Sequence, residues 1–317
     1  MKGIKYISSI CTAVIIMLFI VTGTKTGYAQ QDPVYTQYMN NLMSVNPAYT
    51  GVRGVGSISG IFRQQWLNLK GAPTTSSLTL SMPLDSLHVG GGMDFLHDNF
   101  GHFSTTALFL DYSYRIRATQ TTQISFGLKA GFNYVQSRLT EIDRYHYDDA
   151  YILEYGDYTR FLPNFGVGIF WYGEDFYAGF AVPRLLQNEY TKDEVSVQAA
   201  SREQRHYFLH SAYMLQLSPT TVFKPGLTTM ITAGAPVTAD FDFSFLFLDR
   251  FWVGAMYRIS DAIGAYAHVQ LNQNLKIGFA YDYTHTRLKS SNDGTFEVML
   301  RYDFKTKGTQ VFPHLGF

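Results

Sequence analysis

The chain has one cysteine, few charged residues and, after its first segment, no apolar run long enough to cross a membrane as a helix. Cys11 is the only cysteine among 317 residues and lies in the N-terminal apolar run, so the rest of the chain has no disulfide, catalytic thiol or cysteine-based metal site. The 25 basic and 25 acidic side chains give a net charge of +0, which removes any electrostatic reason to bind nucleic acid. An exported chain of this size without disulfides must depend on a large sheet or core.

The N-terminus has the pattern of a secretory signal. Lys2 and Lys5 precede an apolar run from Ile10 to Val21, and small residues follow up to Ala29. The alternative, a membrane anchor, is disfavoured because the apolar run is shorter than the roughly 20 residues that a spanning helix needs. We therefore expect a cleaved signal peptide over residues 1–29 and a mature chain that leaves the cytoplasm.

Aromatic residues and glycine are abundant. The chain holds 25 Phe, 23 Tyr and 27 Gly, and hydrophobic residues make up 46% of it. Many aromatics and glycines without a spanning helix indicate strands in a membrane, because only helices and closed barrels satisfy their backbone hydrogen bonds there.

Period-two alternation is clearest in the segment TTQISFGLKAGFNYVQSR. One face carries apolar residues from Ile124 to Tyr134, and the other carries Ser125, Gly127, Lys129 and Asn133. The pattern lasts long enough to cross a bilayer, which takes about 9–11 tilted residues, whereas strands of soluble proteins average about 5–6. Similar alternation occurs in NLKIGFAYDYTHTR and GTFEVMLRYDF.

In a barrel the polar face must line the lumen, because Lys or Arg facing lipid at mid-depth costs about 2–4 kcal/mol. The charged residues predicted to face the lumen are Asp111, Arg115, Lys129, Asp282, Glu297 and Arg301. Their mixed signs favour pairing across the lumen over a selectivity path of one sign.

Fourteen segments fit this pattern, an even number as a closed bacterial barrel requires. Their centres are Ser59, Leu78, Met93, Phe109, Leu128, Gly168, Ala178, Ala212, Met230, Phe245, Ala255, Ala265, Phe279 and Leu300. The short connections Pro83 to Ser86, Ala118 to Thr121, Tyr172 to Asp175 and Asn272 to Asn274 follow even strands, and the long ones, Arg138 to Arg160 and Pro183 to Gln204, follow odd strands. We therefore predict an all-β transmembrane antiparallel barrel over residues 55–305, with short periplasmic turns and long exterior loops.

The stretch QDPVYTQYMNNLMSVNPAYTG, from Gln31 to Gly51, fits neither a spanning strand nor a long helix. Asn46 can cap a short turn with Pro47 at its first position, and Gly51 can end that turn. We expect residues 30–54 to form an N-terminal segment that plugs the barrel or docks a periplasmic partner; an inert spacer is the alternative.

Five motifs, in order, resemble one family: QDPVYTQYMNNLMSVNPAYTG, FRQQWLNLKGAPTT, FLPNFGVGIFWYGEDFYAGFAVPRLL, RHYFLHSAYML and DRFWVGAMYRISDAIGAYAHVQLNQNLKIGFAYDYT. The chain is similar over nearly all of its mature length to the PorP/SprF family, outer-membrane proteins of the type IX secretion system of Bacteroidota. The resemblance implies a fatty-acid-transporter-like barrel that handles secreted proteins bearing a C-terminal sorting domain, in some members for gliding motility. It also implies partner-binding or plug roles for Tyr35, Gln37, Tyr38, Asn46, Pro47, Tyr49, Gly51, Arg63, Trp66 and Pro73.

The C-terminal tail, residues 306–317, departs from the family pattern. Relatives often end in a Pro-Arg-aromatic tail, whereas His314 and Leu315 stand between Pro313 and the final Phe317. The departure puts any contact made by this tail in doubt, and a frayed end is the alternative.

Catalytic and metal chemistry are poorly supported by the residue spacing. His206 and His210 on one strand lie about 13 Å apart at ~3.3 Å per residue, too far to share a zinc ion. Ser211 and His210 are neighbours that point to opposite faces, and the glycines 90–92 lack the lysine and helix of a phosphate loop. We expect no catalytic residue, metal or cofactor.

The predicted exterior loop EIDRYHYDDAYILEYGDYTR mixes acidic residues with tyrosines. Tyrosine combines apolar area with a hydrogen-bonding tip, which suits protein contact, so we expect Tyr147, Tyr151 and Tyr155 to touch a partner. A solvated loop, an aromatic girdle and a calcium site are the alternatives, although the regular ligand spacing of a calcium loop is missing.

The hypothesis from sequence is an outer-membrane barrel without enzymatic activity. Its expected partners are type IX secretion components, a secreted protein with a C-terminal sorting domain, and outer-membrane lipid. The rivals are a channel for small amphipathic molecules, favoured by an open lumen with a lateral gap, and a lipid hydrolase, favoured by a converging Ser-His pair.

Overall fold

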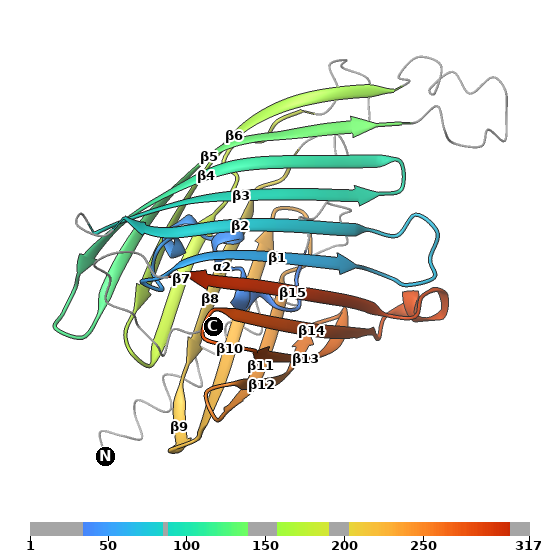
Figure 1. Ribbon diagram of the computed structural model, residues 1–317. Coiled ribbons are helices and arrows are strands. Elements are labelled where there is room, and N and C mark those ends of the chain that lie inside the picture. The colour runs from blue at the N-terminus through green and yellow to red at the C-terminus, as the bar shows by residue number, and fades with distance from the viewer. Residues whose placement is uncertain (1–33, 85–87, 139–156, 190–202, 305–317) are drawn as a thin grey trace, which may run out of the picture.

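The computed structural model describes residues 34–84, 88–138, 157–189 and 203–304, which form a closed antiparallel β-barrel (Figure 1). Its strands are β1 (Gly56–Gln64), β2 (Thr74–Leu84), β3 (Val89–Phe100), β4 (Phe103–Arg117), β5 (Gln123–Ser137), β6 (Tyr158–Tyr172), β7 (Phe176–Val182), β8 (His206–Tyr213), β9 (Leu215–Ser218), β10 (Thr221–Thr232), β11 (Thr238–Phe247), β12 (Phe251–Arg258), β13 (Ala262–Gln270), β14 (Leu275–Thr284) and β15 (Thr295–Phe304).

The barrel has fourteen strand positions because β8 and β9 are two pieces of one strand, interrupted at Met214, and both pair with β10. Each strand pairs with its sequence neighbours, and pairing of β1 with β15 closes the cylinder. The prediction of an even, fourteen-stranded barrel is therefore confirmed, and every predicted strand centre lies within a strand.

The two faces of each strand differ as the alternation predicts. On β5, Ser125, Lys129 and Asn133 are buried, while Phe126 and Leu128 are exposed on the outer surface. Large apolar side chains on the outside and polar ones on the inside reverse the arrangement of a water-soluble protein. This is the arrangement that a lipid environment requires.

The connections differ at the two ends of the barrel. We call the end with the connections β2–β3, β4–β5, β6–β7, β9–β10, β11–β12 and β13–β14 the turn end, and the opposite end the loop end. At the turn end, Leu248 and Asp249 both have positive φ of 53°, as a tight hairpin turn requires. The long connections after β5 and β7 lie at the loop end, and most of their residues fall outside the described part.

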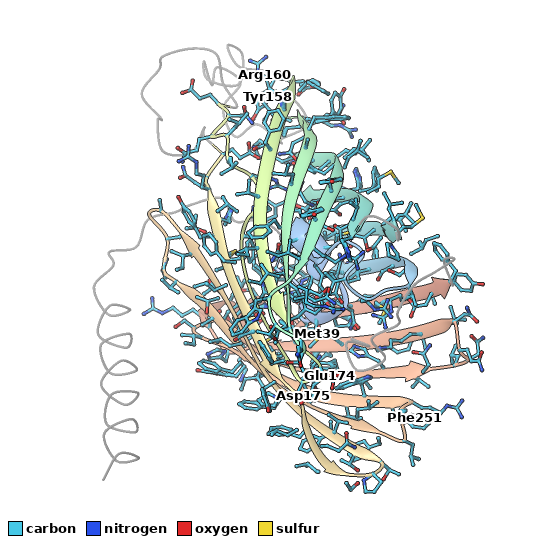
Figure 2. The ribbon with its side chains drawn as sticks, turned by 90° about the vertical axis from the view of Figure 1, so that its left-hand side faces the viewer. Met39, Tyr158, Arg160, Glu174, Asp175 and Phe251 are labelled. Atoms are coloured by element: carbon cyan, nitrogen blue, oxygen red, sulfur yellow. The ribbon has the colours of Figure 1, made fainter. Side chains whose placement is uncertain are left out.

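Residues 34–55, which we call the lumenal segment, lie inside the barrel and appear in blue behind β1 and β2 (Figure 1). The segment forms η1 (Tyr38–Asn40), α2 (Leu42–Val45) and η2 (Pro47–Tyr49). No helix among the described residues is long and apolar enough to span a membrane. Figure 2 shows Met39 of η1 between the two sides of the wall, with Tyr158 and Arg160 near the loop end.

Apolar side chains join the lumenal segment to the wall. Leu42, Ala48 and Val52 pack with inward residues such as Phe170 and Met214, and a second cluster joins the segment to β1, β8, β10 and β15. Fully burying one large apolar side chain stabilises a fold by about 1.5–3 kcal/mol. The hydrophobic core of this protein therefore lies within the barrel, between the segment and the wall.

The wall changes its construction between β6 and β8. β7 pairs with β6 only from Val167↔Val182 to Tyr172↔Tyr177, so the loop-end half of β6 is paired with β5 on one side and has no strand on the other. Residues 183–188, which we call the strap, take that place: Leu185 N donates to Phe165 O at 2.8 Å. A Cβ at Gly166 would lie 2.7 Å from the carbonyl carbon of Pro183, so the strap crosses β6 closely. From sequence, this stretch was predicted only as part of an exterior loop.

The exposed edge of β6 is closed by its own side chains. Pro163 has no N–H to leave unpaired, and Asn164 Oδ1 accepts from the N–H groups of Phe165 and Leu186, each at 2.9 Å. Asn164 Nδ2 donates to Leu186 O and to Glu203, both at 3.0 Å. These bonds satisfy backbone groups that would otherwise form an open sheet edge in the membrane.

Asn164→Ala should loosen the strap without unfolding the barrel. The change removes hydrogen bonds to Leu186 and Glu203, and leaving such buried groups unsatisfied costs about 1–3 kcal/mol. Hydrogen exchange should therefore speed up about tenfold or more in peptides covering residues 183–188. Asn99→Ala, at an exposed position of β3, is the matched control, and equal exchange in both variants would contradict the assigned role of Asn164.

Candidate functional site

The lumenal segment and the side chains that hold it are the most elaborate arrangement in the described structure. Its first residues are anchored towards the loop end by β1, β14 and β15. Arg63 Nη1 contacts Glu297 Oε1 at 2.5 Å and Asp282 Oδ2 at 3.1 Å. Thr36 donates to both carboxylates, through its N–H to Glu297 at 2.6 Å and through its hydroxyl to Asp282 at 2.5 Å. One buried arginine thus joins two buried carboxylates to the chain of the segment.

A second charged anchor comes from β11 and β12. Arg258 pairs with Asp240 at 2.8 Å and donates from Nη2 to Tyr35 O at 3.0 Å. Arg258 is 1% exposed, so its charge is almost wholly removed from water. A buried guanidinium needs both a counter-ion and further acceptors, and here Asp240 and the lumenal segment supply them.

Polar side chains at η1 contact β13, which lies between the strands of the two charged anchors. Gln37 Oε1 and Asn40 Nδ2 lie 2.8 Å and 3.0 Å from His268 Nε2 on β13. Gly278 leaves room for Gln37 because it has no side chain: a Cβ there would lie 2.7 Å from Gln37 Oε1. Gln37, chosen from sequence, is therefore a wall contact of the segment.

A third ion cluster holds α2. Lys129 Nζ lies 2.7 Å from Asp94 Oδ2 and 3.5 Å from Asp111 Oδ1, and it donates to Ser44 O at 3.2 Å. Both Lys129 and Asp111 were predicted from sequence to face the lumen among charges of mixed sign, and both are buried inside the barrel, where they pair between neighbouring strands rather than across the lumen. The structure adds Asp94 and the backbone of the segment to the pair.

The Asn46-Pro47 pair lies against glycines of the wall, Gly127, Gly168 and Gly179. Asn46 Oδ1 accepts from Ala48 N at 3.0 Å and caps η2, whose first residue is Pro47, as expected. Asn46 Nδ2 donates to Ile169 O at 3.1 Å and lies 3.2 Å from His210 Nε2. Glycine is required beside this turn, because a Cβ at Gly127 would lie 2.5 Å from Ala48 Cα.

The segment leaves the lumen at the turn end. Gly51 has φ of +70°, and its carbonyl accepts from Arg115 Nη1 at 2.9 Å. Arg53 makes two 2.8 Å bonds to the carboxylate of Asp303 on β15. Burial acts to lower the pKa of Arg53, but the hydrogen bond and the charge of Asp303 together have the larger effect. The pKa of Arg53 is therefore raised above its usual value. The guanidinium therefore stays charged at every physiological pH.

Two cavities border the lumenal segment in the described structure, and both are small. One cavity of about 40 Å³ is lined by residues that include Ser44, Val45 and Lys129, and another of about 30 Å³ by residues that include Thr36 and Met39. Each has room for only a few water molecules.

Comparison with known protein families shows to which family this chain belongs. Residues 27–302 match the family described as type IX secretion system membrane protein PorP/SprF. The chain belongs to the PorP/SprF family. Family membership and the barrel fold together support an outer-membrane location for this PorP/SprF protein.

Solved structures similar to this PorP/SprF protein are bacterial barrels. The CymD monoaromatic hydrocarbon channel is 10% identical, with a TM-score of 0.51, and the match covers 90% of this chain and 96% of that one. The Ralstonia pickettii toluene transporter TbuX is 8% identical, with a TM-score of 0.48, over 90% and 95% of the two chains. At this identity the likeness to CymD shows the fold alone. No curated protein matches the chain.

The site residues predicted from sequence fall into three groups in this PorP/SprF protein. Those in or against the lumenal segment are Tyr35, Gln37, Tyr38, Asn46, Pro47, Tyr49, Gly51 and Arg63. Trp66 and Pro73 lie instead in the β1–β2 connection at the loop end, where Trp66 N donates to Thr295 Oγ1 at 3.2 Å. Tyr147, Tyr151 and Tyr155 lie outside the described residues.

Several anchoring residues were not identified from sequence. Asp94, Asp240 and Arg258 all hold the segment directly or through an ion pair, yet none had been assigned a role. The available signal was parity: each is a charged residue on the inward face of its strand. Parity marks a residue as lumenal but does not say which backbone it meets.

The described residues hold no group of three or more His, Cys, Asp or Glu side chains arranged for a metal ion. His210 is buried and lies beside Asn46, while Ser211 stands on the alternate face of β8. The neighbouring Ser211 and His210 therefore do not form a nucleophile and base.

Proposed function

We propose that this PorP/SprF protein acts in type IX secretion as an outer-membrane binding protein. Its loop end holds a secreted protein that bears a C-terminal sorting domain at the cell surface, and its turn end contacts other secretion components in the periplasm. The role involves recognition and no chemical step. The cargoes include adhesins for gliding motility where the cell glides.

This proposal rests on the lumen being occupied by the lumenal segment. The lumenal segment crosses the barrel and is tied to the wall by three ion clusters, around Arg63, Lys129 and Arg258. A barrel whose interior is bonded to its own chain suits binding at its ends better than passage through its centre. The family assignment supplies the context of secretion.

The loop end offers the larger surface for a protein partner. Both long connections, after β5 and after β7, emerge there. The first connection contains Tyr147, Tyr151 and Tyr155, and tyrosine is common in protein interfaces.

Site-specific photo-crosslinking in the native outer membrane tests the proposal. A photoreactive residue at 147, 151 or 155 should give an adduct with a secreted protein, and the adduct should disappear when that protein lacks its sorting domain. A probe at Thr121, exposed in the β4–β5 turn, is the matched control at the turn end. Equal adducts at both ends, or adducts that do not depend on the sorting domain, would overturn the proposal.

A channel for small amphipathic molecules is the second candidate, and the strap is the observation that favours it. The wall beside the loop-end half of β6 is closed by residues 183–188 and by side-chain hydrogen bonds instead of a strand. If the protein is a channel whose wall opens at the strap, Asn164→Ala should loosen the strap and speed the uptake of an aromatic hydrocarbon by liposomes that contain the barrel. Unchanged uptake in a variant whose strap exchanges faster would remove this candidate.

A further inference from the structure

A row of hydrogen-bond donors lines the lumen towards the turn end. Lys276 on β14 stands directly opposite Arg301 on β15, and Arg301 stands directly opposite Ser59 on β1. All three side chains face inward, and each residue is at most 4% exposed. We call Lys276, Arg301 and Ser59 the donor row.

The protein supplies almost no acceptors to this row. Among the described residues, no carboxylate lies within ion-pair distance of Lys276, and the buried Ser59 hydroxyl has no hydrogen-bond partner. Arg301 Nε lies 3.5 Å from Asp303 Oδ1 but makes no hydrogen bond. Asp303 is already engaged by both terminal nitrogens of Arg53.

The local charge balance makes this arrangement unfavourable by itself. The other charges close to Lys276 are Arg53, Lys224 and Asp303, and Lys224 has Asp242 near it as well. Lys276 and Arg301 therefore share the single carboxylate of Asp303 with Arg53. Like charges directly opposite each other on paired strands destabilise a sheet, and a buried cation without a counter-ion is costly. Elsewhere in this lumen, the cations Arg63, Lys129 and Arg258 each have a carboxylate at 2.8 Å or less.

We propose that the donor row is a binding site for a small oxyanion, a phosphate or a carboxylate. An ammonium, a guanidinium and a hydroxyl on three adjacent strands are the donors that such a group requires. The row is near the turn end, since Lys276 is the second residue of β14 and Arg301 lies three residues before the end of β15. The bound oxyanion neutralises the excess positive charge beside Arg53, where the lumenal segment leaves the barrel. This site does not depend on the proposed role in secretion.

Thermal unfolding of the full-length barrel in phospholipid-free detergent tests the site. Sodium phosphate should raise the unfolding midpoint above that in sodium chloride of equal ionic strength, in a saturable way and by about 5 °C. Lys276→Met should abolish this shift. It should also raise the midpoint in the absence of oxyanions, because it removes an unpaired buried charge.

Lys70→Met, which changes an exposed lysine at the loop end, is the matched control and should keep the full phosphate response. A parallel titration with sodium acetate separates the two ligand classes: a response to phosphate alone identifies a phosphate site, and a response to both identifies a general oxyanion site. An equal phosphate response in Lys276→Met and Lys70→Met, or no response in the unmodified barrel, would refute the assignment.

Discussion

Gly127→Ala should displace the lumenal segment and turn a closed barrel into a conducting one. The new methyl group would lie 2.5 Å from Ala48 Cα and closer still to the Ala48 amide, and both are backbone atoms that no rotamer change can move. Overpacking of this kind costs about 1–3 kcal/mol. Because about 1.4 kcal/mol corresponds to a tenfold shift, the displaced state should become roughly ten to a hundred times more populated.

Conductance in planar bilayers measures this change directly. Gly60→Ala is the matched control, because a Cβ there meets only Ser77 O at 3.8 Å. The control should remain as closed as the unmodified barrel. If a folded Gly127→Ala barrel conducts no more than the control, the segment does not close the lumen, and the argument from an occupied lumen to a binding role loses its basis.

Arg63→Met should produce the largest loss of stability among single changes in the lumen. Arg63 is 2% exposed and lies between Glu297 and Asp282, so its removal leaves two buried carboxylates without their cation. Breaking a buried ion pair from one side costs about 3–5 kcal/mol. The same change frees Thr36 from one of its three partners, so the segment should also loosen near its start.

Denaturant unfolding in lipid vesicles gives the free energy for this comparison. Arg117→Met, at the exposed end of β4, should leave the unfolding free energy almost unchanged. The double variant Arg63→Met with Glu297→Gln should recover part of the loss, because it neutralises one of the orphaned carboxylates. Equal stability of the Arg63→Met and Arg117→Met barrels would show that the ion cluster contributes little.

These two predictions address different properties of the same segment. Gly127 controls whether the backbone of η2 can fit against the wall, and Arg63 controls the charge balance around its first residues. If Gly127→Ala opens the barrel and Arg63→Met destabilises the barrel without opening it, backbone fit and electrostatics act separately.

Alternation along the strands was sufficient to predict the barrel. On β5, β14 and β15 every second residue is apolar, and the exposed outer face of the structure consists of those residues, including Phe126, Phe279 and Leu300. Such a pattern can be read locally, because side chains of a strand alternate between faces at each residue. The cap of η2 was also predictable, because Asn46, Pro47 and Ala48 are sequence neighbours.

The strap was not predictable, because its partners are distant in sequence. Asn164 bonds to Leu186 and Glu203, which lie beyond the end of β7. A proline in the middle of a strand, as at Pro163, indicates an unpaired edge, but it does not show which residues cover that edge. Only the early end of β7, which is a property of the whole barrel, turns Pro163 and Asn164 into the closure of an edge.

By itself, the sequence determined the family, the strand positions and the inward direction of six charged residues, because these depend on local order and on period-two alternation. The tertiary structure decided which charges meet: Arg63 with Glu297, Lys129 with Asp94, and Lys276 with no carboxylate among the described residues. The physical reason is that pairing in a lumen depends on register between strands and on the path of residues 34–55 through the centre. Neither is a property of any one stretch of sequence.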